Sequence, residues 1–210
     1  MKKTLSKDYF EKVADSWESM QHSFFSEAAR KKAYEIAKVN NQDTISDIGC
    51  GTGYISEGLI DMQIKIIAVD QSQAMINEMK KKFINFNNIY YRLGESENLP
   101  IDDNEVNYAF ANMYLHHVND PSKSIIEMFR IIKPGGKLII TDLDEHNFDF
   151  LRKEQYDRWL GFKRSDLKIW FENAGFKNVR VDCVGDNCCA KSSQKDEQAS
   201  ISIFIAYGEK

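Results

Sequence analysis

The sequence lacks any long hydrophobic stretch. Its longest uninterrupted apolar runs, such as 66–69 and 138–140, are far shorter than the roughly 20 residues that a membrane-spanning helix needs. Polar residues follow the initial Met-Lys-Lys, so the apolar part of an export signal is missing as well. The pattern predicts no membrane segment, and the cytoplasm is the expected compartment.

Cysteine is scarce and positive charge is not in excess. The 210 residues include four cysteines, too few for a secreted disulfide scaffold, so we expect reduced thiols. Lys and Arg number 28 against 32 Asp and Glu, and the net charge is -4 at pH 7. This balance gives no general attraction to phosphate backbones or anionic membranes and argues against a nucleic-acid partner.

Alternating apolar patterns are present along most of the chain. They predict strands at about 44–48, 64–69, 88–93, 106–111, 137–141, 179–184 and 201–207, and helices at about 5–20, 26–39, 54–62, 73–83, 121–132 and 166–174. The polar region 186–199 is predicted to be a mobile loop. Repeated strand-helix units followed by a helix-free strand pair predict an α/β fold: a doubly wound, mostly parallel seven-stranded sheet with one antiparallel strand near its edge.

A glycine-rich turn follows the first predicted strand. Its glycines, Gly49, Gly51 and Gly53, depart from the G-x-G-x-x-G spacing that accommodates a pyrophosphate. Asp47 places a negative charge beside the turn, which disfavours a phosphate and favours a cationic group. Asp70, at the end of the second strand, can accept hydrogen bonds from ribose hydroxyls. The combined demand is for a ribose and an amine without a diphosphate, which S-adenosylmethionine meets.

Four ordered motifs carry a resemblance to a known family. They are Asp47–Gly53, Asp70–Ser72 with Met75, Gly94–Pro100 and Arg130–Gly136. Together they resemble the class I S-adenosylmethionine-dependent methyltransferases, and most of all the small-molecule branch related to the ubiquinone and menaquinone C-methyltransferases. The resemblance implies a Rossmann-like methyltransferase domain over 26–210. It also implies an N-terminal helical lid over 1–25, because Tyr9–Ala14 and Trp17 resemble the segment of that branch that closes over the cofactor.

The resemblance also implies roles for individual residues toward S-adenosylmethionine. The methionine moiety is expected next to Asp47, Gly49, Cys50 and Gly51, and the ribose next to Asp70. The adenine ring with its amino group is expected next to Gln71, Glu95 and Ser96. The ammonium group is expected next to the backbone carbonyl of Asn112. Cys50 is expected to pack in the turn rather than react.

Methyl transfer from a sulfonium is an in-line displacement, so alignment and desolvation can supply most of the rate. A base is useful where the acceptor is an alcohol, an amine or an acidic carbon. His146, after the fifth strand, is our first candidate, and His117, after the fourth, is the second. A structural role at the start of a helix is the other interpretation of His116 and His117, and no metal site is predicted.

Three cysteines gather near the C-terminal end of the sequence. The strand at 179–184 should run parallel to the others, so the turn after it opens on the cofactor face and places Cys183, Cys188 and Cys189 near the mouth of the active site. Three converging thiolates would suit trivalent arsenic or a thiophilic metal. Residues 185–189 and 201–208 also resemble, more weakly, methyltransferase domains fused to arsenic-responsive repressors. A purely structural role for these cysteines is the alternative.

The leading hypothesis is methyl transfer from S-adenosylmethionine to a small molecule aligned under the N-terminal lid, in which Tyr9 and Trp17 take part. Two alternatives stay open: methylation of a metalloid such as arsenite held by the C-terminal cysteines, and a regulatory protein that binds the cofactor without turnover. A nucleic-acid or protein substrate is disfavoured by the net charge and by the shortness of the additions to the core. The sequence leaves the oligomeric state open.

Overall fold

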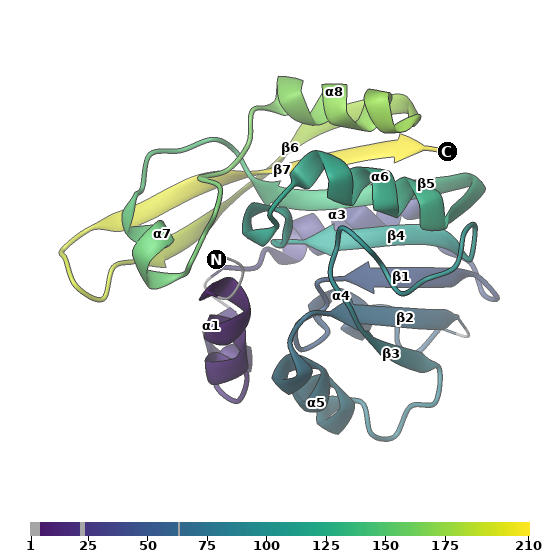
Figure 1. The fold of residues 1–210 in the computed structure, drawn as a ribbon, viewed down its shortest axis with the longest axis horizontal. Coiled ribbons are helices and arrows are strands. Elements are labelled where there is room, and N and C mark those ends of the chain that lie inside the picture. The colour runs from purple at the N-terminus through teal and green to yellow at the C-terminus, as the bar shows by residue number, and fades with distance from the viewer. Residues whose placement is uncertain (1–4, 22–23, 63) are drawn as a thin grey trace.

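A computed structural model describes residues 5–21, 24–62 and 64–210. Its described strands form a seven-stranded sheet in the order β3-β2-β1-β4-β5-β7-β6 (Figure 1). The strands are β1 (Thr44–Ile48), β2 (Lys65–Asp70), β3 (Ile89–Leu93), β4 (Val106–Asn112), β5 (Ile132–Leu143), β6 (Lys177–Lys191) and β7 (Gln198–Glu209). Only β7 runs antiparallel to its neighbours, β5 and β6. The predicted fold class, with one antiparallel strand next to the edge, is confirmed.

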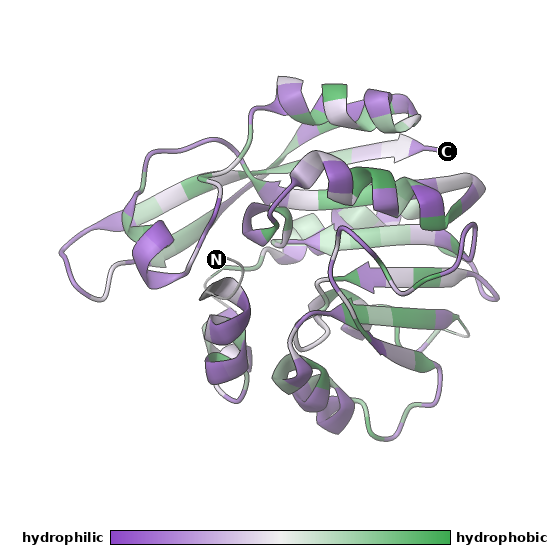
Figure 2. Ribbon diagram, viewed as in Figure 1, coloured by the Kyte–Doolittle hydropathy of each residue, from purple (hydrophilic) through white to green (hydrophobic). Residues whose placement is uncertain are grey.

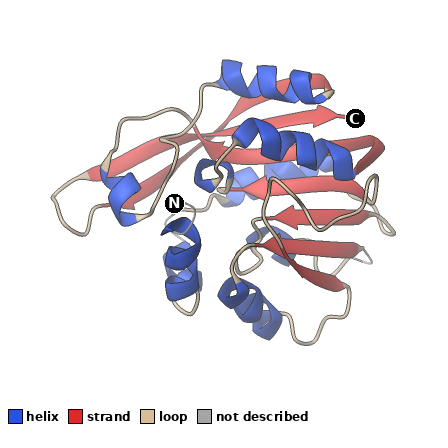
Figure 3. Cartoon of the chain, in the orientation of Figure 1, coloured by secondary structure: helices blue, strands red, loops and turns tan. Residues whose placement is uncertain are grey.

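Helices cover both faces of the sheet (Figure 3). One apolar cluster joins the sheet to α3 (Glu27–Ala37), α4 (Tyr54–Glu57) and α5 (Gln73–Lys82), and another joins it to α6 (Pro121–Ile131) and α8 (Arg164–Ala174). In Figure 1, α6 and α8 lie in front of the sheet and α3 lies behind it. Figure 2 shows the hydrophobic central strands between these layers. None of the helices in the described ranges is long and apolar enough to cross a membrane.

Helix starts follow capping chemistry. The Ser72 hydroxyl accepts from the Met75 amide, and the Asp120 carboxylate accepts from the Lys123 amide with Pro121 at the first helical position. Both starts were predicted. The helix predicted at about 166–174 begins at Arg164, and no side chain caps its start.

The N-terminal segment is broken where one helix was predicted. The apolar stripe over 5–20 forms α1 (Leu5–Val13) and α2 (Trp17–Gln21), separated by a turn. In this turn both the amide and the hydroxyl of Ser16 donate to the Val13 carbonyl, a local bond that competes with continued helix. Residues 1–4 and 22–23 of the predicted lid lie outside the described residues.

The prediction of a mobile loop at 186–199 was wrong, because most of these residues lie in strands. β6 continues to Lys191 and β7 begins at Gln198, so the two strands form a long hairpin that projects past the rest of the sheet (Figure 1). Small and apolar residues on its inner face are buried against Leu143 and α7 (Phe150–Glu154), among them Cys188, Ala190, Ala199 and Ile201. This buried inner face makes the hairpin a packed wall.

Candidate functional site

The glycine turn connects β1 to α4 at the carboxyl end of the sheet. Gly49, Gly51 and Gly53 all have positive φ, at 66°, 52° and 92°. A Cβ atom built on Gly49 would lie 2.1 Å from Cδ2 of Tyr114, so the Tyr114 ring packs directly on the bare backbone. Glycine is therefore required at position 49 both for its conformation and for the space that the ring fills.

Asp70 joins this turn to the end of β2. One carboxylate oxygen accepts from the Gly51 amide at 2.9 Å, and the other accepts from the Ser72 amide at 2.8 Å. Burial raises the pKa of Asp70, and these amides oppose that effect. A fixed carboxylate with lone pairs left over is suited to accept from the hydroxyls of a ribose.

Asp47 lies deeper, beneath the turn. Its Oδ2 accepts from the hydroxyl and the amide of Ser56 at 2.7 and 3.1 Å, and the side chain is buried. Burial raises the pKa of Asp47 to about 6, although the two bonds from Ser56 act in the opposite direction. A cationic ligand next to Asp47 would replace the missing solvation of this carboxylate.

These groups line a pocket that we call the central pocket. It encloses about 570 Å³ of empty space, part of it open to solvent. The sequence-predicted residues that line it are Trp17, Asp47, Gly49, Cys50, Gly51, Asp70, Gln71, Asn112 and His117. Its described lining residues include two carboxylates, Asp47 and Asp70, but no Lys or Arg. That charge favours a cation and disfavours a phosphate, in line with the expectation from Asp47.

A polar side pocket extends from one end of the central pocket. Gln71, Tyr114 and His117 line both spaces. The side pocket adds Glu95 and Ser96, the two residues expected near the adenine. Asp70 thus lines the central pocket and Glu95 lines the adjoining polar side pocket, as expected for neighbours of a ribose and its base.

An apolar side pocket opens on another side of the central pocket. Trp17, Phe25, Met113 and His117 line both spaces, whose empty volumes are about 570 and 390 Å³. Its remaining walls come from the N-terminal segment, the turn after β4, the end of β5, α7 with the residues after it, and the β6–β7 hairpin. The residues are, in that order, Phe24; His116; Leu143; Leu151, Gln155 and Asp157; and Cys188 and Ala190. Most of the side chains that line this pocket are apolar, so it favours an apolar ligand next to the central pocket.

The predicted base His117 lies at the junction of all three pockets. Its ring packs edge-on against Phe10 at 4.9 Å, and its buried Nδ1 has no hydrogen-bond partner. Burial, with a further contribution from His116, holds the pKa of His117 well below its usual range. His117 is therefore a neutral imidazole, with a free ring nitrogen, at the site.

The neighbouring His116 has a different environment. Its Nδ1 lies 2.6 Å from Oδ1 of Asp142, and its Nε2 lies 3.9 Å from Oδ1 of Asp157. Burial alone would lower the pKa of His116, but the carboxylates of Asp142 and Asp157 outweigh it and raise that pKa to about 9. The structural role considered for this residue agrees with its bond to Asp142.

His146, the first candidate for a base, does not line any of the three pockets. Its Nδ1 accepts from the Phe148 amide at 3.3 Å, and burial lowers the pKa of His146 to about 4. Tyr9, predicted to belong to the lid, also does not line them. The centre of its ring lies 5.2 Å from that of the Tyr156 ring.

The three C-terminal thiols do not converge. Cys188 is buried in the apolar side pocket, where burial raises its pKa to about 12. Cys183 and Cys189 are exposed, and Cys183 accepts from the Gly185 amide. Among the described residues, no three-cysteine group has its sulfur atoms close enough to hold one ion. The shared thiolate centre considered as one alternative is therefore not formed, because adjacent residues of a strand, such as Cys188 and Cys189, point to opposite faces.

Several lining residues were not predicted. Phe10 and Phe25 come from the N-terminal segment, Met113 and Tyr114 follow β4, and Asp157 lies in an irregular stretch after α7. The position of Met113 and Tyr114 directly after a strand was a usable signal. Asp157 had none, because its approach to the histidines depends on how the chain returns after α7.

Known proteins share both sequence and fold with this chain. Residues 46–140 match the methyltransferase domain family. A demethylmenaquinone methyltransferase of Staphylococcus carnosus is 29% identical over 72% of this chain and 75% of its own length. A malonyl-[acyl-carrier protein] O-methyltransferase of Yersinia pestis is 26% identical over 68% of this chain, which spans only about half (51%) of that protein.

A solved structure shows the same fold. The phosphoethanolamine N-methyltransferase 2 of Haemonchus contortus, in complex with S-adenosyl-L-methionine, superimposes with a TM-score of 0.78 at 14% identity over 99% of this chain and 60% of that one. The matched domain contains the glycine turn, Asp47 and Asp70, and its surroundings fit a cationic nucleoside. Residues 46–140 of this chain therefore match the methyltransferase domain family, and the chain shares its fold with a solved methyltransferase that binds S-adenosyl-L-methionine.

Proposed function

We propose that this protein transfers the methyl group of S-adenosylmethionine to a small molecule bound in the apolar side pocket. The observation that carries the proposal is the shared wall of the two pockets, formed by Trp17, Phe25, Met113 and His117. A cofactor in the central pocket and an acceptor in the apolar side pocket would meet at this wall. There the methyl group can pass in line from sulfur to the acceptor, leaving S-adenosylhomocysteine.

The cofactor would take the orientation set by charge. Its ammonium group would lie toward Asp47, its ribose hydroxyls would donate to Asp70, and its adenine would enter the polar side pocket toward Glu95. Apolar walls around the sulfonium would exclude water while its positive charge is lost in the transfer. The largely apolar acceptor space and the relatives named for demethylmenaquinone and malonyl-[acyl-carrier protein] support a small acceptor.

The N-terminal segment is proposed to act as a lid. Phe10 and Trp17 line the central pocket, and Trp17 has only 8% of its surface exposed. The segment is held to α5 by the Glu11 carboxylate, which accepts from the Gln73 amide at 2.7 Å, and by a 2.5 Å ion pair of Glu18 with Lys82. Such exposed polar links are weak enough to open and close around a ligand.

We propose that His117, rather than His146, is the base that takes a proton from the acceptor as the methyl group is transferred. It lines both the central and the apolar side pocket and keeps a free ring nitrogen. We expect His117→Ala to reduce turnover while cofactor binding is kept. The same change at His146 should have a smaller effect, because that ring lies outside the lining of both pockets.

Two measurements test the proposal. Calorimetry with S-adenosylhomocysteine should show binding to the wild type, strong weakening in Asp70→Ala, and no weakening in Asp61→Ala, an acidic residue exposed outside the site. Radiolabelled methyl transfer to a panel of small phenols, quinols and amines should then identify an acceptor. Equal affinity for wild type and Asp70→Ala would contradict the cofactor site, and binding without transfer to any acceptor would favour a regulatory role.

A further inference from the structure

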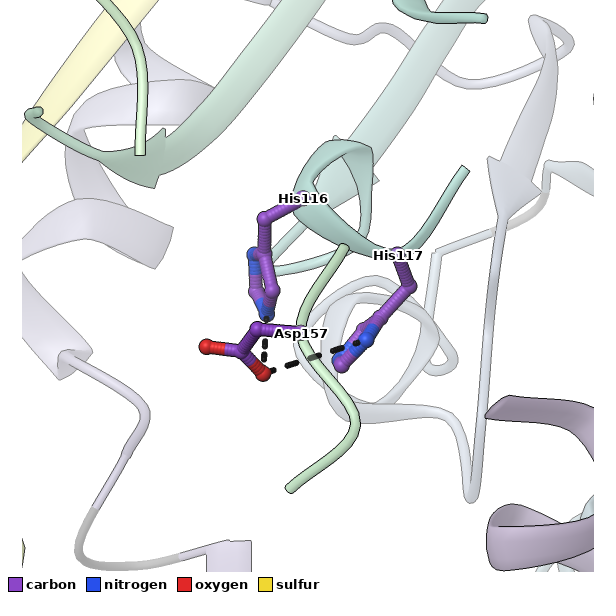
Figure 4. Close-up of side chains that lie close together, drawn as sticks. All are labelled: His116, His117 and Asp157. Atoms are coloured by element: carbon purple, nitrogen blue, oxygen red, sulfur yellow. Dashed lines mark ion pairs between the residues drawn. The ribbon is translucent and has the colours of Figure 1, made fainter. Parts of the chain in front are cut away.

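Two imidazoles and a carboxylate face one another on the wall of the apolar side pocket (Figure 4). Asp157 Oδ1 lies 3.9 Å from His116 Nε2 and 4.0 Å from His117 Nδ1. These distances are too long for hydrogen bonds. All three atoms nevertheless lie within 4.8 Å of one another, so a single ion could contact each of them.

One of these atoms is left unsatisfied. His117 Nδ1 is buried without a hydrogen-bond partner, in a side chain only 9% exposed. An orphaned buried ring nitrogen is costly, and in a native structure it calls for an explanation. A backbone hydrogen bond with Tyr156 also acts on the pKa of His117. The ring is placed so that Nδ1 faces the Asp157 carboxylate (Figure 4).

The second imidazole is held in a matching way. His116 Nδ1 lies 2.6 Å from Asp142 Oδ1, and Asp142 Oδ2 accepts from the backbone amides of Tyr114 and His116. The anchored carboxylate thus aims His116 Nε2 at Asp157. A carboxylate behind the far nitrogen of a histidine is the arrangement that orients and strengthens metal-binding imidazoles.

We propose that His116 Nε2, His117 Nδ1 and Asp157 Oδ1 bind one divalent ion of the zinc class. Two imidazoles and one carboxylate are a ligand set that leaves a fourth position open for another molecule. Bond lengths of about 2.0–2.2 Å place tetrahedral ligands roughly 3.3–3.6 Å apart. The two distances to Asp157 Oδ1, 3.9 and 4.0 Å, therefore need to shorten by about half an ångström, and the two imidazole nitrogens, which lie within 4.8 Å of each other, by up to about 1.5 Å. The ion would sit at the wall shared with the apolar side pocket.

This site deepens the proposed function and rests on it for one point only. If the acceptor occupies the apolar side pocket, an oxygen of the acceptor would take the open fourth position, and His117 would act on the acceptor as a ligand of the ion. The substrate class is then a small molecule with a metal-binding oxygen close to the atom that is methylated. Binding of the ion itself does not depend on this role.

The test uses the full chain, stripped of metal, in a Cys183→Ser, Cys189→Ser background that removes the exposed thiols as competing ligands. Titration with Zn²⁺ in a calorimeter should give one equivalent. His117→Ala and Asp157→Asn should each lose that binding, and Asp142→Asn should weaken it about 10–100-fold. His146→Ala, which removes a histidine outside the cluster, should bind like its parent. X-ray absorption of the zinc form should show nitrogen and oxygen neighbours without sulfur.

Circular dichroism and thermal unfolding of each variant serve as the control for folding, and binding of S-adenosylhomocysteine is measured alongside. Zinc binding that is undiminished in both His117→Ala and Asp157→Asn, sulfur neighbours in the absorption spectrum, or a parent that binds S-adenosylhomocysteine but no zinc would overturn the metal site. The two proposals fail separately: zinc bound at the cluster without cofactor binding would contradict the proposed function and leave the metal site standing.

Discussion

At the scale of single residues, the two acidic groups of the central pocket depend on different partners for their charge. Asp70 accepts backbone hydrogen bonds on both of its oxygens, from the Gly51 amide on one and from the Ser72 amide on the other. Asp47 receives both of its bonds from the single residue Ser56, on one oxygen, while the other oxygen has no such support among the described contacts. Asp47 therefore depends most on a cationic ligand, and its charge should be the most sensitive to pH.

Asp47 predicts a pH dependence of both stability and binding. Its folded pKa of about 6 is above the unfolded value of 3.8, so its contribution to the stability of the ligand-free protein is fully present below pH 3.8 and is lost as pH rises through 6. The loss is at most ~3 kcal/mol, from 1.36 kcal/mol per pKa unit. Denaturant unfolding between pH 4 and 7 measures this slope. The free energy of unfolding of the wild type, minus that of Asp47→Asn, should fall as the pH rises.

The same carboxylate should tune cofactor affinity in the opposite direction. Since an ammonium group binds the ionised form of Asp47, affinity for S-adenosylhomocysteine should rise ~tenfold between pH 5 and 7, on either side of the Asp47 pKa of about 6. Calorimetry at the two pH values measures this change, and Asp47→Asn should bind weakly at both. A wild-type affinity that does not change with pH would rule out contact between Asp47 and the ammonium group.

Gly49→Ala should damage the site more than a comparable change elsewhere. Gly135 is the matched control, because it also has positive φ, 80°, but a Cβ there would meet nothing within 4 Å. Both variants carry the backbone cost of about 1–2 kcal/mol. Gly49→Ala must also displace Tyr114, at about 1–3 kcal/mol more. Denaturant unfolding should show this difference in stability between the two variants. Calorimetry should show a loss of cofactor affinity only in Gly49→Ala. Equal stability and equal affinity in the two variants would mean that Tyr114 moves aside freely.

At the scale of elements, α1 and α2 form a unit whose apolar face is shared between α5 and the central pocket. Trp17 contacts aromatic rings within its own segment, Phe10 at 5.3 Å, Phe24 at 6.3 Å and Phe25 at 6.1 Å, and Met75 of α5 belongs to the same cluster. Most of its partners therefore move with it if the segment opens. A lid can keep its own small core in this way.

Trp17→Ala distinguishes a lid from a permanent part of the core. For a lid, we expect a stability loss below the about 3–5 kcal/mol typical of a buried tryptophan, and weaker binding of S-adenosylhomocysteine. The ligand should also protect the first 25 residues of the wild type from limited proteolysis. Trp170→Ala, in α8 and outside the three pockets, should leave cofactor affinity unchanged. Equal proteolysis with and without ligand would exclude the lid.

The elements that could be predicted from sequence are those with a strong periodic signal. The β-branched run before Asp70 and the caps at Ser72 and Asp120 place the cofactor side of the sheet accurately. The outer half of the β6–β7 hairpin has the same alternation, but its inward residues are as small as Cys188 and Ala190, so it resembles a polar loop. The break between α1 and α2 was missed because the apolar stripe continues across it.

Long-range contacts set the limit of what the sequence could show about the site. Asp70 and the glycine turn lie at the ends of two neighbouring parallel strands, so their meeting follows from the predicted topology. The meeting of His117 with Asp157 depends on an irregular return of the chain after α7, and the position of Cys188 depends on which face of β6 it occupies. No local pattern specifies either contact.

At the scale of the whole molecule, the two ligands would be bound by different parts of the sheet. The central pocket lies over the ends of β1, β2 and β4, whereas the apolar side pocket takes a wall from β5 and the β6–β7 hairpin. Changes on the hairpin should therefore alter acceptor use without altering cofactor binding.

Ala190→Phe should fill the apolar side pocket, since Ala190 lines that pocket and is only 4% exposed. We expect turnover to fall ~tenfold or more, at a stability cost of about 1–3 kcal/mol, with unchanged affinity for S-adenosylhomocysteine. Ser200→Phe is the control, because it adds the same ring to an exposed position of the same hairpin. Full activity of Ala190→Phe on an identified acceptor would place the acceptor elsewhere.

The position of β7 also has a consequence for how the protein is made. β7 follows β6 in the chain, yet it lies between β5 and β6 in the sheet. On the ribosome, β6 therefore emerges before the strand that attaches it, while β1, β2, β4 and β5 can already pair. A nascent chain could thus assemble its nucleoside site and hold the methyl donor before the place for the molecule to be methylated exists.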